Sequence, residues 1–165
     1  NEINRMAEVP VLVYGNKKLS QSGAILDYLN GKTGNYFGKN DEERSEILRW
    51  VLWDNSRLSG SLGPTRFLMN FIPKDKKPVE VINYLQKRND AALSVLESHL
   101  SGKNWVAADQ LSAADLSCCS YLFYPEEFGF NRKSLPNIDR WLSNIEALEN
   151  WKHPYDLLER AYPPK

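Results

Sequence analysis

A short polar run, Ser20, Gln21 and Ser22, stands directly before an apolar pattern with helical spacing. The first turn of a helix leaves backbone N–H groups without partners and carries the positive end of the helix dipole, so it readily binds a carboxylate or a phosphate. A hydroxyl and an amide at this place add further hydrogen-bonding groups for such a ligand. Simple N-capping by the same side chains needs no ligand, and from this segment alone it is the favoured interpretation.

The elements around this polar run are predicted to be a β-hairpin and a helix. Residues 9–14 are apolar and rich in β-branched side chains, and the Gly-Asn pair at 15–16 suits a two-residue turn that returns along residues 17–20. The helix that follows opens on the polar run and carries an apolar stripe. Pro10 cannot donate to a strand ladder, so an edge or a strand start is favoured over a cis peptide bond.

Beyond a glycine-rich linker at 31–40, the sequence pattern is helical throughout and shows no strand and no internal repeat. A first long helix is predicted from Asp41 through Trp53, broken by Gly60, Gly63 and Pro64. The remaining helical segments are predicted at 65–72, 79–100, 112–123, 136–148 and 151–162.

One segment of the first long helix, around residues 47–53, is apolar on nearly every side, so we expect it to be buried on more than one face. One face would pack within the helical bundle. The other face, which carries Trp50, Trp53 and Arg57, must meet either a ligand cleft or another subunit.

A Ser-Ala-Ala-Asp run at 112–115 resembles a capping box, with Asp where Glu or Gln is usual. We expect Ser112 and Asp115 to fix the start of a core helix, because loss of such a cap costs about 0.5–2 kcal/mol. Asp115 is therefore interpreted as a structural residue rather than a catalytic carboxylate.

Other residue types argue against several classes of protein. The neighbours Cys118 and Cys119 lie in an apolar helical pattern, which indicates buried free thiols rather than a disulfide scaffold and fits a reducing compartment. His99 and His153 stand alone, without the spacing of a zinc site, so no metal is expected. The formal net charge is +0, no apolar run is long enough to cross a membrane, and no secretory signal is present, so neither nucleic acid nor membrane is an expected partner.

A resemblance to the glutathione transferases rests on several runs taken together. These are Val-Pro-Val-Leu at 9–12, Leu-Ser-Gln-Ser-Gly-Ala-Ile at 19–25, the capping box, Leu-Pro-Asn at 135–137, and Trp-Lys-His-Pro-Tyr at 151–155, which is similar to the end of a bacterial subgroup. The resemblance covers nearly the whole chain. It implies a mainly α fold, with the C-terminal half of a thioredoxin-like glutathione-binding domain at 1–34 and an all-helical domain at 41–165.

The same resemblance implies roles for individual residues. Val9 would offer backbone hydrogen bonds to the cysteinyl part of glutathione, and Pro10 after it would be cis, which reverses the interpretation from sequence alone. Gln21 and Ser22 would hold the γ-glutamyl carboxylate and amine. A cleft for the second substrate is predicted, from helix faces and aromatic content, to draw on Trp50, Trp53, Arg57, Thr65 and Phe67.

The chain departs from the family pattern before Val9. The family's domain begins with a strand, a helix and a second strand, a unit of roughly thirty residues. Only the segment from Asn1 to Glu8 precedes Val9 here, and it shows no strand pattern. We therefore expect the catalytic Tyr, Ser or Cys, which favours the glutathione thiolate in the family, to lie upstream of Asn1.

Without that group, we expect this chain to bind glutathione weakly or not at all and to show no turnover on its own. Micromolar glutathione affinity of residues 1–165 by calorimetry would contradict this expectation.

For the intact parent, the resemblance implies a cytoplasmic, homodimeric enzyme that adds the glutathione thiolate to a small apolar electrophile. Two alternatives remain open. One is a glutathione-dependent disulfide reductase, and the other is a binding or assembly module that keeps the fold without turnover. Glutathione is the only small-molecule partner or co-substrate that the resemblance implies besides the electrophile.

Overall fold

The computed structural model describes residues 4–34 and 36–157, and it begins with the predicted hairpin. Strands β1 (Val11–Tyr14) and β2 (Lys17–Ser20) pair antiparallel, with Tyr14 opposite Lys17. Gly15 takes a φ of +57° in the turn between them, which a glycine adopts without strain. The Val9–Pro10 peptide bond is cis, as the family resemblance implied. Strand β1 thus begins two residues later than the apolar run does.

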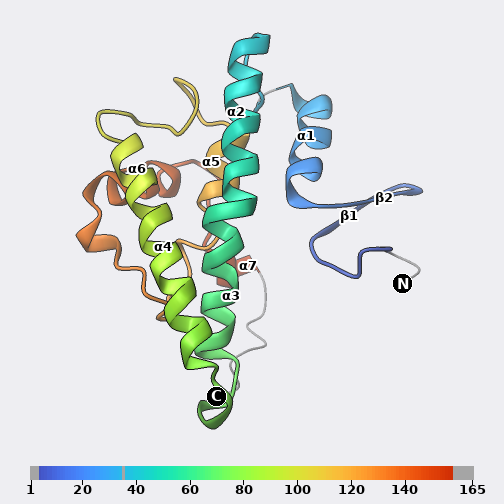
Figure 1. The fold of residues 1–165 in the computed structure, drawn as a ribbon. Coiled ribbons are helices and arrows are strands. Elements are labelled where there is room, and N and C mark those ends of the chain that lie inside the picture. The colour runs from blue at the N-terminus through green and yellow to red at the C-terminus, as the bar shows by residue number, and fades with distance from the viewer. Residues whose placement is uncertain (1–3, 35, 158–165) are drawn as a thin grey trace.

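Helix α1 (Ser22–Thr33) follows β2 directly and lies beside the long helices of the bundle (Figure 1). It ends at Gly34, which has a left-handed φ of +71° and donates its N–H to the carbonyl oxygen of Asn30. The predicted linker at 31–40 is therefore helical in its first part. Arg44 pairs with Asp27 at 2.7 Å and joins α1 to the next helix.

The prediction that glycine and proline break the first long helix was wrong. Helix α2 (Asp41–Trp53) continues through one π-helical turn (Asp54–Leu58) into α3 (Ser59–Asn70), with Pro64 inside α3. The glycines serve close packing instead. A Cβ on Gly60 would lie 2.6 Å from the carbonyl oxygen of Asn55, and one on Gly63 would lie 2.7 Å from the hydroxyl oxygen of Tyr121. Position 60 has no space for a side chain, because the atom it would meet is backbone, whereas a side chain at position 63 would displace the Tyr121 ring.

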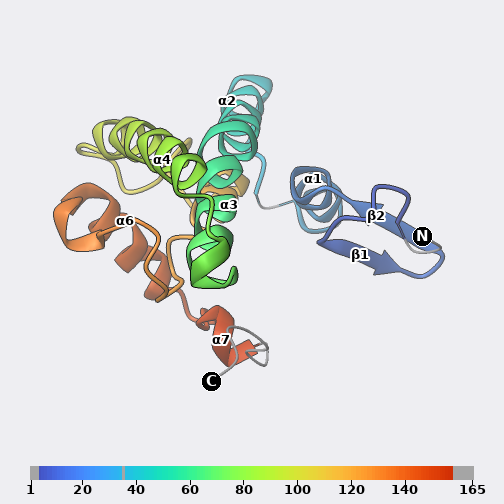
Figure 2. The ribbon, with the colours of Figure 1, turned by 60° about the horizontal axis from the view of Figure 1, so that its bottom comes forward.

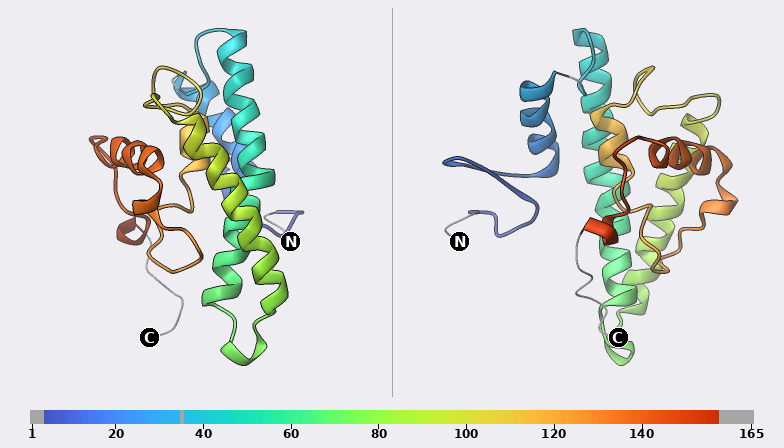
Figure 3. Two further views of the ribbon diagram at one scale, coloured as in Figure 1. Left: turned by 60° about the vertical axis from the view of Figure 1, so that its left-hand side comes forward. Right: turned by 180° about the vertical axis from the view of Figure 1, so that it is seen from behind.

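Helix α4 (Val79–His99) packs along α3 and the π-helical turn, and α5 (Ala113–Cys118) packs on α2 (Figures 1 and 3). The remaining helices are α6 (Pro136–Glu146) and the short α7 (Pro154–Leu157), with 3₁₀ turns at Lys74–Lys76 and Arg132–Ser134. Helix α5 is shorter than predicted, because tight turns replace it after Cys118 and direct the aromatic side chains of Tyr121 and Tyr124 toward α3.

Two predictions concern the ends of the chain. The last part of the predicted closing segment, 158–162, lies outside the described residues. Asn1, upstream of which the catalytic residue is expected, lies outside them as well. The structure therefore tests neither prediction.

The hydrophobic core lies wholly within the helical bundle. Its fully buried large side chains include Trp141, Phe128, Ile47 and Leu96. The hairpin and α1 contribute no buried residue, and they lie to one side of the bundle (Figure 2). None of the described helices is both long and apolar enough to span a membrane.

The capping box is present as predicted. Its aspartate also accepts hydrogen bonds from residues outside α5, which the sequence did not indicate. The fully buried carboxylate of Asp115 accepts hydrogen bonds from the backbone N–H and the hydroxyl of Ser112, at 2.9 and 2.8 Å. It also accepts from the backbone N–H of Val106 and the indole N–H of Trp141, at 2.8 and 2.9 Å. Asp115 therefore ties α5, α6 and the loop before α5 together.

Candidate functional site

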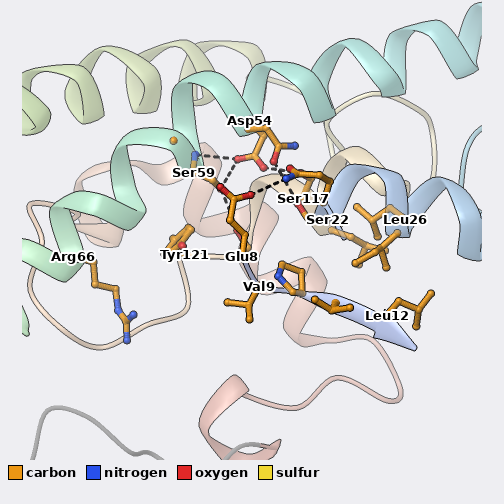
Figure 4. A pocket seen from close by; sticks show the side chains of 18 of the residues that line it. Glu8, Val9, Leu12, Ser22, Leu26, Asp54, Ser59, Arg66, Ser117 and Tyr121 are labelled. Carbon is orange, nitrogen blue, oxygen red and sulfur yellow. Dashed lines mark hydrogen bonds between the residues drawn. The ribbon is translucent and has the colours of Figure 1, made fainter. Parts of the chain in front are cut away.

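A cavity of about 750 Å³ lies between the hairpin–α1 unit and the helical bundle (Figure 4). One wall brings together four residues predicted for glutathione: Val9, Pro10, Gln21 and Ser22. The cis peptide bond turns the chain at this wall, and Val9 is 91% exposed. The segment just before β1 supplies Val9 and Pro10, whereas the start of α1 supplies Gln21 and Ser22.

The start of α1 is not capped in the manner that the sequence alone favoured. Gln21 makes no side-chain cap, and its φ of +71° is a left-handed conformation that a non-glycine residue rarely adopts. Its side-chain amide instead donates to a Glu8 carboxylate oxygen at 2.8 Å and to the Met6 sulfur at 3.3 Å. The hydroxyl of Ser22 donates to the side-chain oxygen of Asn55 at 3.3 Å. Strained backbone of this kind concentrates at functional sites.

The floor of the cavity carries a buried carboxylate that the sequence did not single out. Asp54 is 2% exposed and begins the π-helical turn. One of its oxygens accepts from the backbone N–H and the hydroxyl of Ser59, at 3.2 and 2.7 Å. The other accepts from the hydroxyl of Ser117 at 2.6 Å. The Ser59 hydroxyl also lies 3.2 Å from that of Ser120, which extends the network along the floor.

Burial raises the pKa of the Asp54 carboxyl, although the hydrogen bonds from Ser117 and Ser59 oppose this shift. Burial likewise raises the pKa of Tyr121, and the Asp54 carboxylate contributes to that shift. Burial therefore favours the protonated form of both the Asp54 carboxyl and the Tyr121 phenol.

The wall opposite the hairpin is formed by Tyr121, Tyr124 and Arg66. The Arg66 guanidinium lies over the Tyr124 ring, 3.9 Å from its centroid. It pairs with the buried Glu126 carboxylate at 3.0 Å and donates to the Tyr155 hydroxyl at 2.7 Å. The Tyr155 hydroxyl in turn donates to Glu126. Residues from α3, the loop after α5 and α7 are thus joined at the cavity rim.

The residues predicted for the second-substrate cleft do not come together at this cavity. Trp50 is buried in the core, 4.2 Å from the His99 ring, and Thr65 is fully buried with a hydrogen bond from Asn89. Phe67 is 53% exposed. Trp53 and Arg57 line a separate cavity of about 230 Å³ beside α4.

The cysteines and histidines lie in the core or bond to the backbone. Cys118 and Cys119 are buried free thiols, as predicted, and burial raises the pKa of Cys119 to about 12. His99 and His153 bond to the backbone carbonyls of Val106 and Phe123, respectively. Within residues 4–34 and 36–157, no three His, Cys, Asp or Glu side chains are grouped so as to hold a metal ion.

Comparison with known proteins agrees with this architecture. Glutathione S-transferase F11 of Arabidopsis thaliana is 28% identical over 159 residues, covering 91% of this chain and 74% of the relative. Disulfide-bond oxidoreductase YfcG of Escherichia coli is 29% identical over 133 residues, covering 81% and 56% of the two chains. A solved glutathione transferase from Burkholderia graminis, with two glutathione molecules bound per subunit, is 25% identical, with a TM-score of 0.79 over 89% of this chain and 66% of that one.

The helical half of the chain matches a family as a whole. Residues 65–149 match the family described as glutathione S-transferase, C-terminal domain. This match takes in the second half of α3, all of α4 to α6, the capping box and the aromatic wall of the cavity. The chain therefore belongs to the glutathione S-transferase family.

Proposed function

We propose that this protein binds glutathione in the cavity between its hairpin and its helices, and that it transfers the glutathione thiolate to an electrophile. The observation that carries this proposal is the composition of one cavity wall. Four residues that the family resemblance assigns to glutathione, Val9, Pro10, Gln21 and Ser22, line the same space. Residues 1–34 would act as the glutathione-binding part and residues 41–165 as the helical domain.

Each group on this wall has a chemical role in the proposal. The backbone of Val9, beside the cis bond, would pair with the cysteinyl part of glutathione. Gln21 and Ser22, at the positive end of the α1 dipole, would hold the γ-glutamyl carboxylate and amine. In the present structure the Gln21 amide donates to the Glu8 carboxylate at 2.8 Å. On glutathione binding, the γ-glutamyl carboxylate would take the place of the Glu8 carboxylate as the acceptor. None of the lining residues is assigned the role of activating the thiol.

The second substrate would lie against the helical wall. Apolar and aromatic side chains face the cavity there and from α1, namely Leu26, Leu116, Tyr121 and Tyr124. Such a surface favours a small apolar electrophile. Activity of the full-length protein with glutathione and an aryl halide tests this proposal. Absence of both turnover and glutathione binding by calorimetry would refute it.

A disulfide reductase is the second candidate, because one relative carries the name disulfide-bond oxidoreductase. Thiol–disulfide exchange needs the same grip on glutathione but a different acceptor. Assay of the full-length protein with a mixed disulfide beside the aryl halide separates the two reactions. Glutathione binding without either activity would favour the third candidate, a binding module.

We also propose that the protein is a cytoplasmic homodimer. Helices α2 and α4 expose a set of large apolar side chains: Leu48, Leu52, Val81, Tyr84 and Val95. The small cavity lined by Trp53 and Arg57 opens beside this set. Burial against a second copy would remove the set from water. Sedimentation of the full-length protein, with Leu52→Glu as the disrupting variant, tests the dimer. The two free thiols support a reducing compartment.

A further inference from the structure

The two methionines of this chain lie in contrasting surroundings. Met69 is in α3 and packs against the hydrophobic core. Met6 lies before the hairpin and is 58% exposed, so its sulfur is accessible to an oxidant in solution. Oxidation changes this apolar side chain into a polar one. In the folded chain, methionine oxidation is therefore expected first at Met6.

The two cysteines are poor competitors for the same oxidant. Cys118 and Cys119 are buried free thiols, and burial raises the pKa of both, that of Cys119 to about 12. Peroxides oxidise the thiolate rather than the thiol, and they need access to it. The exposed thioether is thus the most accessible sulfur among the described residues.

The Met6 sulfur contacts the start of α1. The Gln21 side-chain amide donates to it at 3.3 Å, and the Ser20 hydroxyl donates to it at 3.5 Å. A thioether sulfur is a weak acceptor, so it holds neither donor firmly. Gln21 lines the cavity, whereas Met6 is not one of the lining residues. Met6 therefore acts on the cavity through Gln21.

A hydrogen-bonded turn holds Met6 in this position. The side-chain oxygen of Asn4 accepts from the Met6 backbone N–H at 3.0 Å, and the Asn4 side-chain amide donates to the backbone carbonyl of Glu8 at 2.6 Å. The Ala7 backbone N–H donates to the carbonyl oxygen of Asn4 at 3.2 Å. Asparagine side chains typically stabilise turns in this way. The backbone at Met6 is thus held where its side chain can reach Gln21.

The two N–H groups of the Gln21 amide have acceptors of very different strength. One donates to the Glu8 carboxylate at 2.8 Å, and the other donates to the Met6 sulfur. The proposed function requires this amide for the γ-glutamyl carboxylate. To reach that ligand, the amide has to leave its present acceptors, and a neutral thioether releases it at little cost. The chemical state of Met6 therefore determines how easily Gln21 turns to glutathione.

We propose that Met6 is a site of oxidation by peroxides, and that its sulfoxide lowers the affinity for glutathione by holding the Gln21 amide. The inference rests on the proposed function, because it requires glutathione at Gln21. It describes a regulation of that site, and Met6 takes no part in the transfer of the thiol.

The oxidation needs only a peroxide as co-reactant. A lone pair of the Met6 sulfur forms a bond to the terminal peroxide oxygen, and the O–O bond breaks. The proton of the attacked oxygen passes to the departing oxygen, which leaves as water or as an alcohol. Sulfur loses two electrons and the peroxide gains them. The sulfoxide oxygen carries a partial negative charge, and the flexible Met6 side chain can withdraw enough to place it beside the Gln21 amide.

The first test measures glutathione affinity of the full-length protein before and after hydrogen peroxide. Treatment with dithiothreitol follows the peroxide, because it restores reversibly oxidised thiols and leaves methionine sulfoxide in place. By calorimetry we expect the Kd of glutathione to rise about fivefold in the wild-type protein, the effect of about one hydrogen bond. The same rise is expected in Met69→Leu, the matched control, and none in Met6→Leu. Mass spectrometry of peptides confirms the oxygen on Met6.

The outcomes of this test separate the two proposals. An equal rise of Kd in Met6→Leu overturns the inference, and so does an unchanged Kd in wild-type protein with oxidised Met6. Either result leaves the proposed function intact. Untreated full-length protein that does not bind glutathione overturns the proposed function, and the inference with it.

A second test reverses the oxidation and then imitates it. Methionine sulfoxide reductases, one for each epimer of the sulfoxide, should return the Kd of the oxidised protein to its starting value. Met6→Gln offers the Gln21 amide a carbonyl oxygen without any oxidant, and Met6→Leu is its control without an oxygen. We expect a Kd several-fold higher in Met6→Gln than in Met6→Leu. Equal values in the two variants, or a Kd that repair of Met6 does not lower, would overturn the inference.

Discussion

The hairpin–α1 unit and the helical bundle differ in how they are held. The bundle buries large side chains such as Trp141 and Phe128, whereas the hairpin and α1 bury none completely. The hairpin unit is attached through a few contacts, among them Ser22 to Asn55 and Arg44 to Asp27. Most of the buried core therefore lies in one region, whereas the residues proposed to bind glutathione lie in the other. Regions with few buried contacts open more readily, so ligand binding should stabilise the hairpin unit most.

The largest effect on stability is expected from Asp115→Ala, which removes buried hydrogen bonds from the core of the helical bundle. The substitution leaves the N–H groups of Val106, Ser112 and Trp141 buried without their acceptor, and each such group costs about 1–3 kcal/mol. We expect a loss of about 3 kcal/mol or more in the free energy of unfolding, measured with urea. The exposed Asp109→Ala is the control and should lie within about 0.5 kcal/mol of wild type. A loss of unfolding free energy no larger than that of the control would show that Asp115 has no such structural role.

The second largest effect is expected from a substitution that weakens the contact between the hairpin–α1 unit and the helical bundle. A Cβ on Gly23 would lie 3.0 Å from a methyl carbon of Val51, so Gly23→Leu would push α1 away from α2. Overpacking of this kind costs about 1–3 kcal/mol, and we expect it to fall on the docking of α1. Glutathione affinity should drop about tenfold, and amide exchange should speed up in α1 but not in α4.

Gly31→Ala is the matched control within the same helix, because nothing lies within 4 Å of a Cβ there. It should leave glutathione affinity unchanged. Faster exchange across α4 as well as α1 in Gly23→Leu would mean that the two regions unfold as one unit.

A pH effect is expected at Asp54, which lies between the two regions. Its carboxyl has a raised pKa in the folded state, so the folded protein holds a proton that the unfolded chain releases. Stability from this group is present below its ordinary pKa of 3.8 and is lost as the pH rises through the folded value. Asp54→Asn should flatten this decline in a series of unfolding curves. A decline of unchanged slope in the variant would assign it to other groups.

The smallest effect concerns Glu8, within the hairpin region. Its carboxylate accepts from the Gln21 amide at an exposed position, where such an interaction is worth about 0.2–1 kcal/mol. Glu8→Gln removes a negative charge from the space proposed for the γ-glutamyl carboxylate. We expect about two- to fivefold tighter glutathione binding by calorimetry, and no change in Glu80→Gln on α4. Weaker binding in Glu8→Gln would indicate that the carboxylate contacts glutathione directly.

The sequence predicted correctly those features that depend only on residues close together in the chain. The Gly-Asn turn, the Ser112–Asp115 box and the burial of Cys118 and Cys119 each follow from a few neighbouring residues, and all are present. The cis bond before Pro10 followed only from the family resemblance. For the cavity, the family resemblance pointed to Val9, Pro10, Gln21 and Ser22, and these four residues line the same wall.

The opposite wall could not be predicted, because its causes are tertiary. Tyr121 faces the cavity since α5 ends at Cys118, and helix periodicity gave no sign of that end. The prediction of which side chains share a face of α2 and α3 assumes either that the helix ends between them or that it continues with regular α-helical spacing. The π-helical turn invalidates both assumptions, so Thr65 is buried and Phe67 exposed, away from Trp53 and Arg57.

The π-helical turn at Asp54–Leu58 also bears on how such a protein changes over evolution. A π turn holds one residue more per hydrogen-bonded ring than an α turn, and it typically stands at functional sites. Loss or gain of a single codon here would rotate α3 against α2 by about 100°, one residue's share of a helical turn. Such a rotation would also turn the buried Leu62 and Thr65 of α3 away from their present neighbours. A chain length that varies at this one place among relatives would therefore record a repacking of α3 together with a reshaped cavity.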